Sequence, residues 1–373
     1  MIYEQPHASG GAGRYTREDF GSSPLLAFYE ITRSCNLLCR HCRAEAQPKG
    51  HPDELTTAMS MRLVDGLTNF PKPPLLVLTG GDPIKRHDVF DLVEHAVARG
   101  LKTAMTPSAT KLVTTEAVQR LKTAGLHRLA VSLDGADAAR HDGFRRVPGS
   151  FERTLEIMRD ARAAGLPMQI NTTLSRHNID QLDAMAHLLT AHGIVMWSVF
   201  FLVPTGRATA DQRINPWQYE GAFETLLRHS RVQPYAIKTT EAPHYRRFVM
   251  ERALEDRAGG GAGPAAVPGV VGTNDGRGVM FVSHTGEIFP SGFMPILCGN
   301  FPRDSLVNIY QNSEIFKSLR DPSRLKGKCG YCQYGEICGG SRARAYAITG
   351  DALDSEPDCV YVSPFNNRIT RPC

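Results

Sequence analysis

Short strand-like runs alternate with longer amphipathic segments between residues 25 and about 205 of this 373-residue chain. Near-continuous apolar runs of this kind are typical of parallel strands covered on both faces. Six are expected as strands: 25–31, 75–79, 101–106, 128–133, 168–173 and 197–203. Segments between them have helical spacing, as at 56–70, 88–100 and 150–165. The repeats predict an α/β fold, either an open doubly wound sheet or a barrel, with ligands at the carboxyl ends of the strands.

The nine cysteines of the chain are unevenly distributed. They form an N-terminal group, a C-terminal group and two isolated positions: Cys35, Cys39 and Cys42; Cys329, Cys332, Cys338 and Cys359; Cys298 and Cys373. The N-terminus has no apolar signal-like region, and the most apolar run, 195–204, is shorter than the roughly 20 residues that span a bilayer. We therefore expect a cytoplasmic protein with reduced thiols, whose clustered cysteines bind metal or take part in catalysis.

The charge of the chain is only mildly basic. A net charge of +5 arises from 43 basic and 38 acidic residues, and the basic residues are scattered along the sequence. Nucleic-acid binders gather their basic residues into patches or runs. We therefore expect neither a nucleic acid nor a membrane among the partners.

The N-terminal cysteine group directly follows the first expected strand, in the sequence CNLLCRHC (35–42). Three thiolates are one short of the tetrahedral set of a structural zinc site, and they suit a cubane iron–sulfur cluster with one open iron. An open coordination position is what a catalytic metal requires. A zinc ion completed by a distant histidine is the alternative.

CNLLCRHC resembles the CxxxCxxC motif of radical S-adenosylmethionine (SAM) enzymes. The resemblance implies that Cys35, Cys39 and Cys42 hold a [4Fe–4S] cluster whose open iron binds SAM. In that family, reduction of the cluster cleaves SAM to a 5′-deoxyadenosyl radical, which abstracts hydrogen from the substrate. It also implies a partial (β/α)6 TIM-like barrel. His41 stands before the third cysteine, where many members have an aromatic residue.

Gly80-Gly81-Asp82-Pro83, after the second expected strand, is similar to the GGEP motif of the same family. The resemblance implies that this loop binds the methionine amino group of SAM, with glycines permitting close approach. Five residues at the ends of later strands match further cofactor-binding positions: Ser132, Asp134, Asn171, Thr173 and Leu202. Simple capping of strand ends is the alternative for these five.

The spacing of Cys329, Cys332, Cys338 and Cys359 allows a zinc ion or a second iron–sulfur cluster. This segment resembles the SPASM/twitch extension of radical SAM enzymes, which carries auxiliary clusters. Three positions where a full SPASM domain has cysteines for another cluster hold other residues: Asn274, Ser291 and Arg342. The resemblance therefore implies one auxiliary [4Fe–4S] cluster with four cysteine ligands, suited to electron transfer or substrate placement.

Cys298 lies near this segment and is expected to be a buried, unreactive thiol. A role as an extra ligand or a substrate-facing group is the alternative.

Residues 329–351 resemble the C-terminal segment of the radical SAM enzymes of alternative haem and haem d1 synthesis, which alter tetrapyrrole side chains. This implies hydrogen abstraction followed by oxidative decarboxylation, or another side-chain change, on a carboxylate-rich small molecule. The cations that could bind its carboxylates are Arg207, Lys238, His244, Arg246, Arg247, Arg342 and Arg344. A solvated basic surface is the alternative. An electron donor such as flavodoxin or ferredoxin is implied.

Two other functions remain open at this point. Many SPASM proteins mature ribosomally made peptides, often with a fused domain that binds the leader peptide. About 24 residues precede the first expected strand, so a separate partner protein would have to bind the leader. The second alternative is a non-catalytic iron–sulfur electron carrier or sensor.

The expected organisation places a radical SAM barrel before a smaller α+β iron–sulfur domain. The boundaries are an N-terminal tail (1–24), the barrel (25–210), a bridging helix and linker (211–270), the auxiliary-cluster domain (271–365) and a C-terminal tail (366–373). Residues 258–269 are rich in Gly, Ala and Pro, as linkers are. Beyond them, a β-hairpin is expected around His284-Thr285-Gly286.

Overall fold

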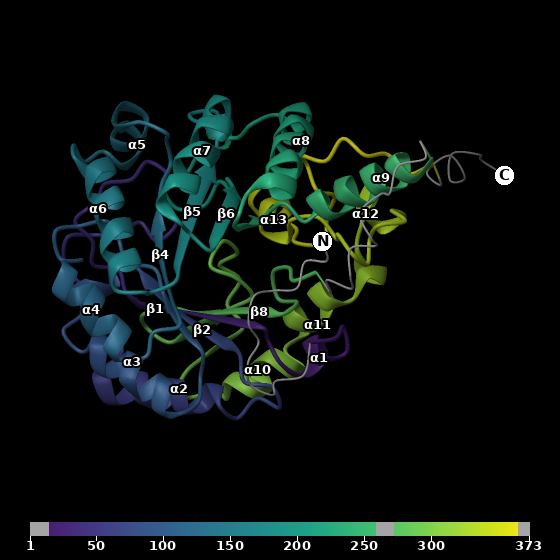
Figure 1. Ribbon diagram of the computed structural model, residues 1–373. Helices are drawn as coiled ribbons and strands as arrows, with labels where there is room; N and C mark the ends of the chain where they lie inside the picture. Colours follow the sequence, from purple (N-terminus) through teal and green to yellow (C-terminus); the bar gives the residue numbers. More distant parts are fainter. Residues whose placement is uncertain (1–14, 259–271, 365–373) are drawn as a thin grey trace.

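The structure is a computed structural model that describes residues 15–258 and 272–364. Most of the predicted linker and the C-terminal tail with Cys373 lie outside the described residues. Within them, ten strands form one sheet in the order β10-β9-β8-β1-β2-β3-β4-β5-β6-β7. Helices cover its outer face in an arc (Figure 1). The sheet is parallel from β8 to β7, so the predicted α/β fold is confirmed.

The strands are β1 (Leu26–Thr32), β2 (Leu75–Gly80), β3 (Thr103–Met105), β4 (Arg128–Ser132), β5 (Met168–Leu174), β6 (Met196–Phe201), β7 (Ala236–Thr240), β8 (Val279–Val282), β9 (Glu287–Phe289) and β10 (Gly299–Asn300). The helices are α1 (Asp19–Ser22), α2 (Thr57–Leu67), α3 (Val89–Ala98), α4 (Thr115–Thr123), α5 (Ala138–Arg145), α6 (Ser150–Ala163), α7 (Leu182–His192), α8 (Pro216–Val232), α9 (His244–Ala258), α10 (Leu306–Asn312), α11 (Glu314–Arg320), α12 (Gly327–Gly330) and α13 (Arg342–Thr349).

The two faces of the sheet differ in chemistry. In β5, Ile170 and Leu174 are fully buried beneath the helices, whereas Asn171 and Thr173 on the opposite face are only partly buried. Successive side chains of a strand point to opposite faces, so β5 alternates although its sequence was expected to be covered on both sides. The inner face of β5 therefore carries polar side chains, which can hold a ligand.

The six expected strands correspond to β1 to β6, and a seventh, β7, was not predicted. It lies in the stretch expected to be a bridging helix and linker, and it pairs in parallel with β6. Its sequence, AIKTT, lacks the apolar run that identified the others, because four of its residues are only half-buried and Lys238 is exposed.

The hairpin expected around His284 is confirmed as β8 and β9, which pair antiparallel. β8 also pairs in parallel with β1, so the sheet continues across the predicted boundary at residue 271. A small buried cluster of Val203, Met294, Leu319 and Ala343 joins α11 and α13 to the loop after β6. The cysteine-bearing C-terminal elements therefore pack directly against the βα repeats.

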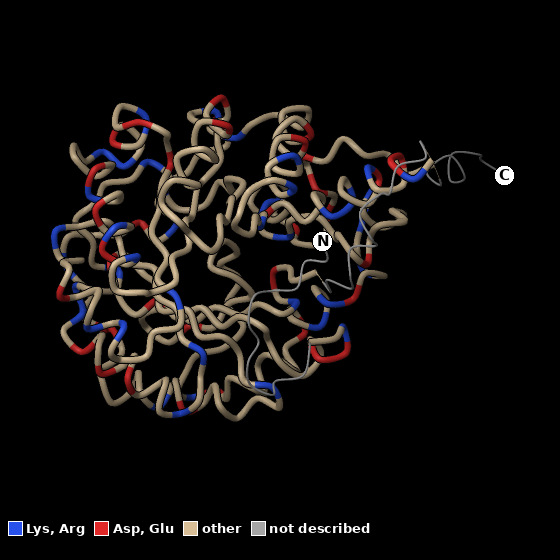
Figure 2. The backbone as a smooth tube through the Cα atoms, viewed as in Figure 1, with Lys and Arg blue, Asp and Glu red and all other residues tan. Residues whose placement is uncertain are grey.

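Figure 2 shows Lys and Arg interspersed with Asp and Glu along the outer helices in that view. Within the described ranges, no helix combines the length and apolar character needed to cross a membrane.

Candidate functional site

The N-terminal cysteines lie in the loop after β1, where Cys35 and Cys39 are buried and Cys42 is partly buried. Each sulfur accepts a hydrogen bond from an N–H group: Leu37 N to Cys35 Sγ (3.3 Å), Arg145 Nη1 to Cys39 Sγ (3.5 Å) and Ala46 N to Cys42 Sγ (3.4 Å). Burial raises the pKa of Cys35 and Cys39, so an added positive charge is needed to keep them as thiolates. A metal cluster supplies that charge, and the N–H donors fit its thiolate ligands.

Asp134 was predicted to contact SAM, but the structure gives its carboxylate other partners. It is fully buried and accepts hydrogen bonds from Arg145 Nε (2.7 Å) and Thr173 N (2.7 Å). Burial alone would raise the pKa of Asp134, but the charge of Arg145, together with the smaller effects of His41, His141 and the hydrogen bond from Thr173 N, lowers it. In this geometry Asp134 holds a cation against Cys39. Arg145 was not identified from the sequence, and no local motif marks it.

His41 is held in a stack of rings beside the same loop. Its ring lies 4.1 Å from that of Phe144, and the Phe144 ring lies 4.9 Å from that of His177. Burial lowers the pKa of His41 to about 3, so the imidazole is neutral. Its Nδ1 has no hydrogen-bond partner among the described residues. The ring thus packs the cysteine loop onto α5.

The two glycines after β2 are required by the chain itself. A Cβ added at Gly80 would lie 2.2 Å from Thr32 O, and one added at Gly81 would lie 2.4 Å from Ser34 O. Gly81 N donates to Thr32 O (2.8 Å), and Asp82 N donates to Ser34 O (2.7 Å). The sequence explained these glycines by the approach of a ligand, and the structure adds the approach of the cysteine loop.

Asp82 connects the loops that follow β1, β2 and β3. It is fully buried, and it accepts hydrogen bonds from Thr110 Oγ1 (2.7 Å) and Ser108 N (3.3 Å). Ser108 Oγ in turn lies 3.3 Å from Cys35 Sγ. Burial raises the pKa of Asp82. Pro83 begins the short turn that follows. The carboxylate side chain therefore fixes the positions of these loops relative to one another.

The remaining predicted SAM residues lie around the inner face. Ser132, Asn171, Ser198 and Lys238 are in register across β4, β5, β6 and β7, so their side chains share one face. Thr173 is one row closer to the carboxyl edge. Leu202 follows β6 and is buried, with its N–H bonded to Leu174 O (3.1 Å).

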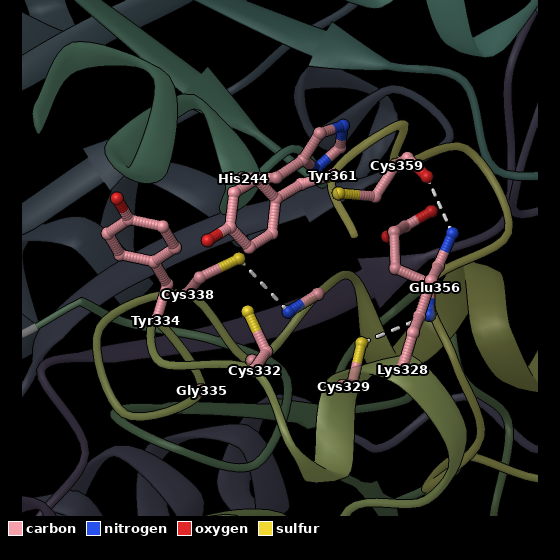
Figure 3. Close-up of a pocket in the computed structure, with 12 residues that line it drawn as sticks. His244, Lys328, Cys329, Cys332, Tyr334, Gly335, Cys338, Glu356, Cys359 and Tyr361 are labelled. Carbon is pink, nitrogen blue, oxygen red and sulfur yellow. Dashed lines mark hydrogen bonds between the residues drawn. The ribbon is translucent and has the colours of Figure 1, made fainter. Parts of the chain in front are cut away.

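The four C-terminal cysteines line one pocket, and Figure 3 shows their sulfurs directed into it. Gly340 N donates to Cys338 Sγ (3.3 Å), and Glu356 N donates to Cys329 Sγ (3.3 Å). Burial raises the pKa of Cys338 to about 12 and that of Cys359 to about 11. As in the first group, only bound positive charge would keep such thiols ionised near neutral pH, so the donor set fits a metal cluster. Among the described residues, no three His, Cys, Asp or Glu side chains form a ready site for a single metal ion.

The residues that replace the further SPASM cysteines contact this pocket's backbone or close a nearby turn. Asn274 Nδ2 donates to Gly340 O (2.7 Å), and Arg342 Nη1 donates to Asp354 O (2.7 Å). Arg342 Nη2 also lies 3.8 Å from Cys329 Sγ. Ser291 is buried and forms an isolated bridge with Met294. Asn274 and Arg342 thereby stabilise the segments that carry the four cysteines.

Cys298 is partly buried at the edge of the main core, and its Sγ donates to Ile296 O (3.4 Å). Burial raises the pKa of Cys298 to about 11. These contacts suit an unreactive thiol.

Several cations predicted for the substrate are engaged inside the protein. Arg344 has no exposed surface and pairs with Glu356 (2.9 Å) and Asp358 (3.2 Å). Arg247 pairs with Glu251 (2.6 Å) and also with Glu220.

Arg246 donates to Ile337 O (3.0 Å) and Thr273 O (2.7 Å), and Arg342 Nη1 donates to Ala352 O (3.0 Å) and Asp354 O (2.7 Å). The structure does not favour these four arginines as substrate ligands, because their guanidinium groups already have acceptors. His244 lines the four-cysteine pocket.

Arg207 and Lys238 differ from those four. Arg207 Nε and Nη2 are buried with no hydrogen-bond partner in the described part of the chain. Lys238, on the inner face of β7, makes no hydrogen bond or ion pair with another described residue. Protein atoms crowded around the inner face, together with the charges of Arg246 and Arg128, lower the pKa of Lys238 to about 8, although its side chain is exposed. These two cations lack a negative partner.

A charged group on the inner face of β1 was missed by sequence reasoning. Glu30 is buried, and its carboxylate binds Arg43 Nη2 (2.9 Å) and His284 Nδ1 (2.8 Å). It links the cysteine loop to the β8–β9 hairpin. A lone Glu in the apolar run LLAFYEI was the available signal, since a charge in a buried strand needs a partner.

Comparison with known proteins agrees with this geometry. Residues 29–189 match the Radical SAM superfamily. The AdoMet-dependent heme synthase of Methanosarcina barkeri (strain Fusaro) is 40% identical over 344 residues, which cover 91% of this chain and 97% of that protein. The chain belongs to the radical SAM superfamily. The AdoMet-dependent heme synthase of Nitratidesulfovibrio vulgaris (strain Hildenborough) is also 40% identical, over 358 residues covering 94% of this chain and 95% of that protein.

The fold is shared with solved radical SAM structures. Streptococcus suis SuiB, bound to its precursor peptide SuiA, has a TM-score of 0.71 at 17% identity, covering 91% of this chain and 76% of that one. The chain is therefore a radical SAM enzyme with a partial barrel, and its cofactors are SAM and a [4Fe–4S] cluster. The interpretation as a non-catalytic electron carrier is not supported.

Proposed function

We propose that this enzyme oxidatively decarboxylates carboxylate side chains of a tetrapyrrole. The observation that carries the proposal is the 40% identity to an AdoMet-dependent heme synthase over 91% of the chain. The resemblance of residues 329–351 to tetrapyrrole-modifying enzymes, drawn from the sequence alone, supports the same substrate class.

The unpartnered cations support a carboxylate-rich substrate. Lys238 stands in the same register row as Ser132 and Asn171, on the inner face where SAM is expected. Arg207 follows β6, and its N–H donates to Cys42 O (3.1 Å), which places it beside the first cysteine loop. Arg207 Nε and Nη2 are buried without a counter-ion, which is costly, so this position favours a bound anion. Lys238 is exposed on the inner face and can reach an anion there. Carboxylates of the substrate would provide it.

A third cation lies deeper on the same face. Arg128 is in register with Ala104 at the amino end of β4, and its Nη1 donates to Gln169 Oε1 (3.2 Å). Its Nε has no partner among the described residues, and burial lowers the pKa of Arg128. Because the charge of Arg128 lowers the pKa of Lys238, an anion bound near both would relieve the repulsion.

The proposed reaction converts a propionate side chain into a vinyl group. Removal of one hydrogen atom from the methylene next to the ring leaves a carbon radical, and the hydrogen is recovered in 5′-deoxyadenosine. Loss of CO₂ then forms a vinyl group and releases one electron to an acceptor. SAM, bound at a cluster held by Cys35, Cys39 and Cys42, supplies the 5′-deoxyadenosyl radical. A cluster held by the four C-terminal cysteines supplies one-electron redox chemistry. We assign the supply of reducing electrons to a flavodoxin or ferredoxin.

The proposal is tested by incubating anaerobically reconstituted, reduced protein and SAM with an iron porphyrin that carries propionates. A panel of peptides is assayed in parallel. We expect 5′-deoxyadenosine and CO₂ in equal amounts with the porphyrin alone. Turnover of a peptide but not of the porphyrin would overturn the substrate class. The peptide-maturase alternative rests on a shared fold and on a lower sequence identity, 27% over 344 residues to a mycofactocin maturase, and no contact within residues 15–258 and 272–364 favours it.

Single variants test the carboxylate sites. Lys238→Met and Arg207→Met should raise KM for the porphyrin by about 10- to 100-fold, as for loss of a charged hydrogen bond. Binding of SAM should be retained. Lys102→Met is the matched control, because Lys102 is exposed before β3, at the amino ends of the strands. Equal KM values for all three variants and the wild type would remove these residues from the substrate site.

A further inference from the structure

His244, the first residue of α9, lies in the wall of the four-cysteine pocket (Figure 3). Its side chain has no exposed surface. Neither Nδ1 nor Nε2 has a hydrogen-bond partner among the described residues. A buried imidazole with both nitrogens unpaired is costly, so such a group in a native protein needs a partner from elsewhere.

The protein side of the ring offers no acceptor. His244 packs against Tyr219, with ring centres 5.1 Å apart, and against the edge of Phe223 at 4.9 Å. The nearby carboxylate of Glu356 is already used by Arg344 Nε (2.9 Å), Ser341 N (2.6 Å) and Asp358 N (3.1 Å). The remaining direction for a ring N–H is the pocket into which the sulfurs point.

The backbone already supplies each cysteine with a donor. Cys338 and Cys329 accept from Gly340 N and Glu356 N, and backbone hydrogen bonds from Tyr334 and Tyr361 lower the pKa of Cys332 and Cys359 against the effect of burial. His244 is therefore an additional side-chain donor in a site whose ligand set is complete without it. The fit is that of a donor to the cluster and not of a fifth ligand.

We infer that His244 donates a hydrogen bond from its neutral ring to a sulfur of the cluster held by Cys329, Cys332, Cys338 and Cys359, and thereby raises the reduction potential of that cluster. A donor to a cluster sulfur stabilises the more negative, reduced state. His244 is a tuning residue that acts through the cluster, in place of the substrate-binding role expected from the sequence. The inference rests on the second cluster of the proposed function and is independent of the substrate.

The test is a redox titration of the second cluster in the full chain, with Cys35, Cys39 and Cys42 changed to Ala so that only this cluster contributes. The signal is the electron paramagnetic resonance of the reduced cluster. His244→Phe keeps a ring and removes the donor. We expect this variant to lower the equilibrium constant for reduction of the second cluster tenfold or more, which lowers its reduction potential by about 59 mV or more for one electron. His244→Gln, which keeps an N–H donor, should recover most of the shift.

Phe223→Leu is the matched control, since it disturbs the packing of the His244 ring and keeps the donor; its potential should stay at the parent value. An unchanged potential in His244→Phe with four irons per chain would overturn the inference, as would an equal shift in Phe223→Leu. If His244→Phe fails to retain iron, the test is pulsed electron paramagnetic resonance of the reduced cluster in the parent protein labelled with ¹⁵N-histidine. A weak nitrogen coupling supports a hydrogen bond, whereas no coupling, or the strong coupling of a ligand, refutes it.

Because no substrate is needed, failure of this test leaves the proposed decarboxylation to be judged by its own assay.

Discussion

Replacing Arg344 by Met should strongly destabilise the segment behind the second cysteine group. The guanidinium is fully buried, pairs with Glu356 and Asp358, and donates to Glu241 O. Methionine fills a similar length without the charge, so the carboxylate of Glu356 would be left buried without its cation. Glu356 N also donates to Cys329 Sγ, which connects this ion pair to the cysteine pocket.

The pKa of Glu356 gives the size of the expected loss of stability. Burial alone would raise it, and the charge of Arg344 is the main cause of its fall from 4.5 to about 2. At 1.36 kcal/mol per unit, this shift corresponds to about 3 kcal/mol of stability. Because the folded pKa is the lower one, the contribution is present above pH ~4.5 and is lost as the pH falls toward 2. Breaking a buried pair costs roughly 3–5 kcal/mol, so we expect a loss in that range at pH 7.

The assay is anaerobic denaturant unfolding of the reconstituted protein, with iron content measured in parallel. Arg344→Met should lose stability and about four irons per chain. Arg344→Met/Glu356→Gln should recover part of the loss, with a coupling of about 0.5–3 kcal/mol. A variant that keeps its stability within about 0.5 kcal/mol of the wild type, in the range of a surface substitution, and instead raises KM for the porphyrin would refute this reasoning. That result would restore Arg344 as a substrate ligand.

Three further variants test the first cysteine loop and a buried carboxyl group. Gly81→Ala places a Cβ 2.4 Å from Ser34 O, so this variant should lose the irons of the first cluster. Gly143→Ala, whose Cβ would have nothing within 4 Å, should retain them. Equal iron contents in the two variants would contradict the close packing of the Gly81 loop against the cysteine loop. Asp134→Asn removes the anion that holds Arg145 against Cys39. We expect the rate of 5′-deoxyadenosine formation, measured by chromatography, to fall at least tenfold. The electron paramagnetic resonance signal of the second cluster should stay unchanged. Burial raises the pKa of Glu241, so the protonated side chain stabilises the fold fully below pH ~4.5 and this contribution is lost as the pH rises. The melting temperature of Glu241→Gln should therefore rise relative to that of the wild type from pH 5 to pH 8. A constant difference in melting temperature would show that Glu241 is ionised throughout.

The βα repeats could be predicted because their strands carry an apolar face that packs under helices. β7 could not, since AIKTT has no such run and faces the polar interior with Lys238. The parallel pairing of Leu26 with Val279 was also beyond local sequence, because it depends on contacts between segments about 250 residues apart.

The two cysteine groups could be found from spacing, because ligands from one loop must be close in sequence to meet at one cluster. The direction of a carboxylate at a strand end could not. Asp134 and Asp82 match positions of a cofactor motif, yet they bond to residues of other elements, Arg145 of α5 and Thr110 of the loop after β3. The partner that decides the orientation comes from another element, and a motif does not contain it.

The cations around the second cysteine group explain why counting charges in the sequence suggested a substrate site there. Four of them bind backbone carbonyls and have no carboxylate partner within the described residues: Arg246, Arg277, Arg342 and Lys328. A [4Fe–4S] cluster with four thiolates is an anion, so these cations balance it and favour its reduced form. At the first group, by contrast, the cation nearest to Cys39 is neutralised by Asp134. These cations would therefore favour reduction of a cluster bound at the second group, as required of an acceptor for the electron that the proposed decarboxylation releases.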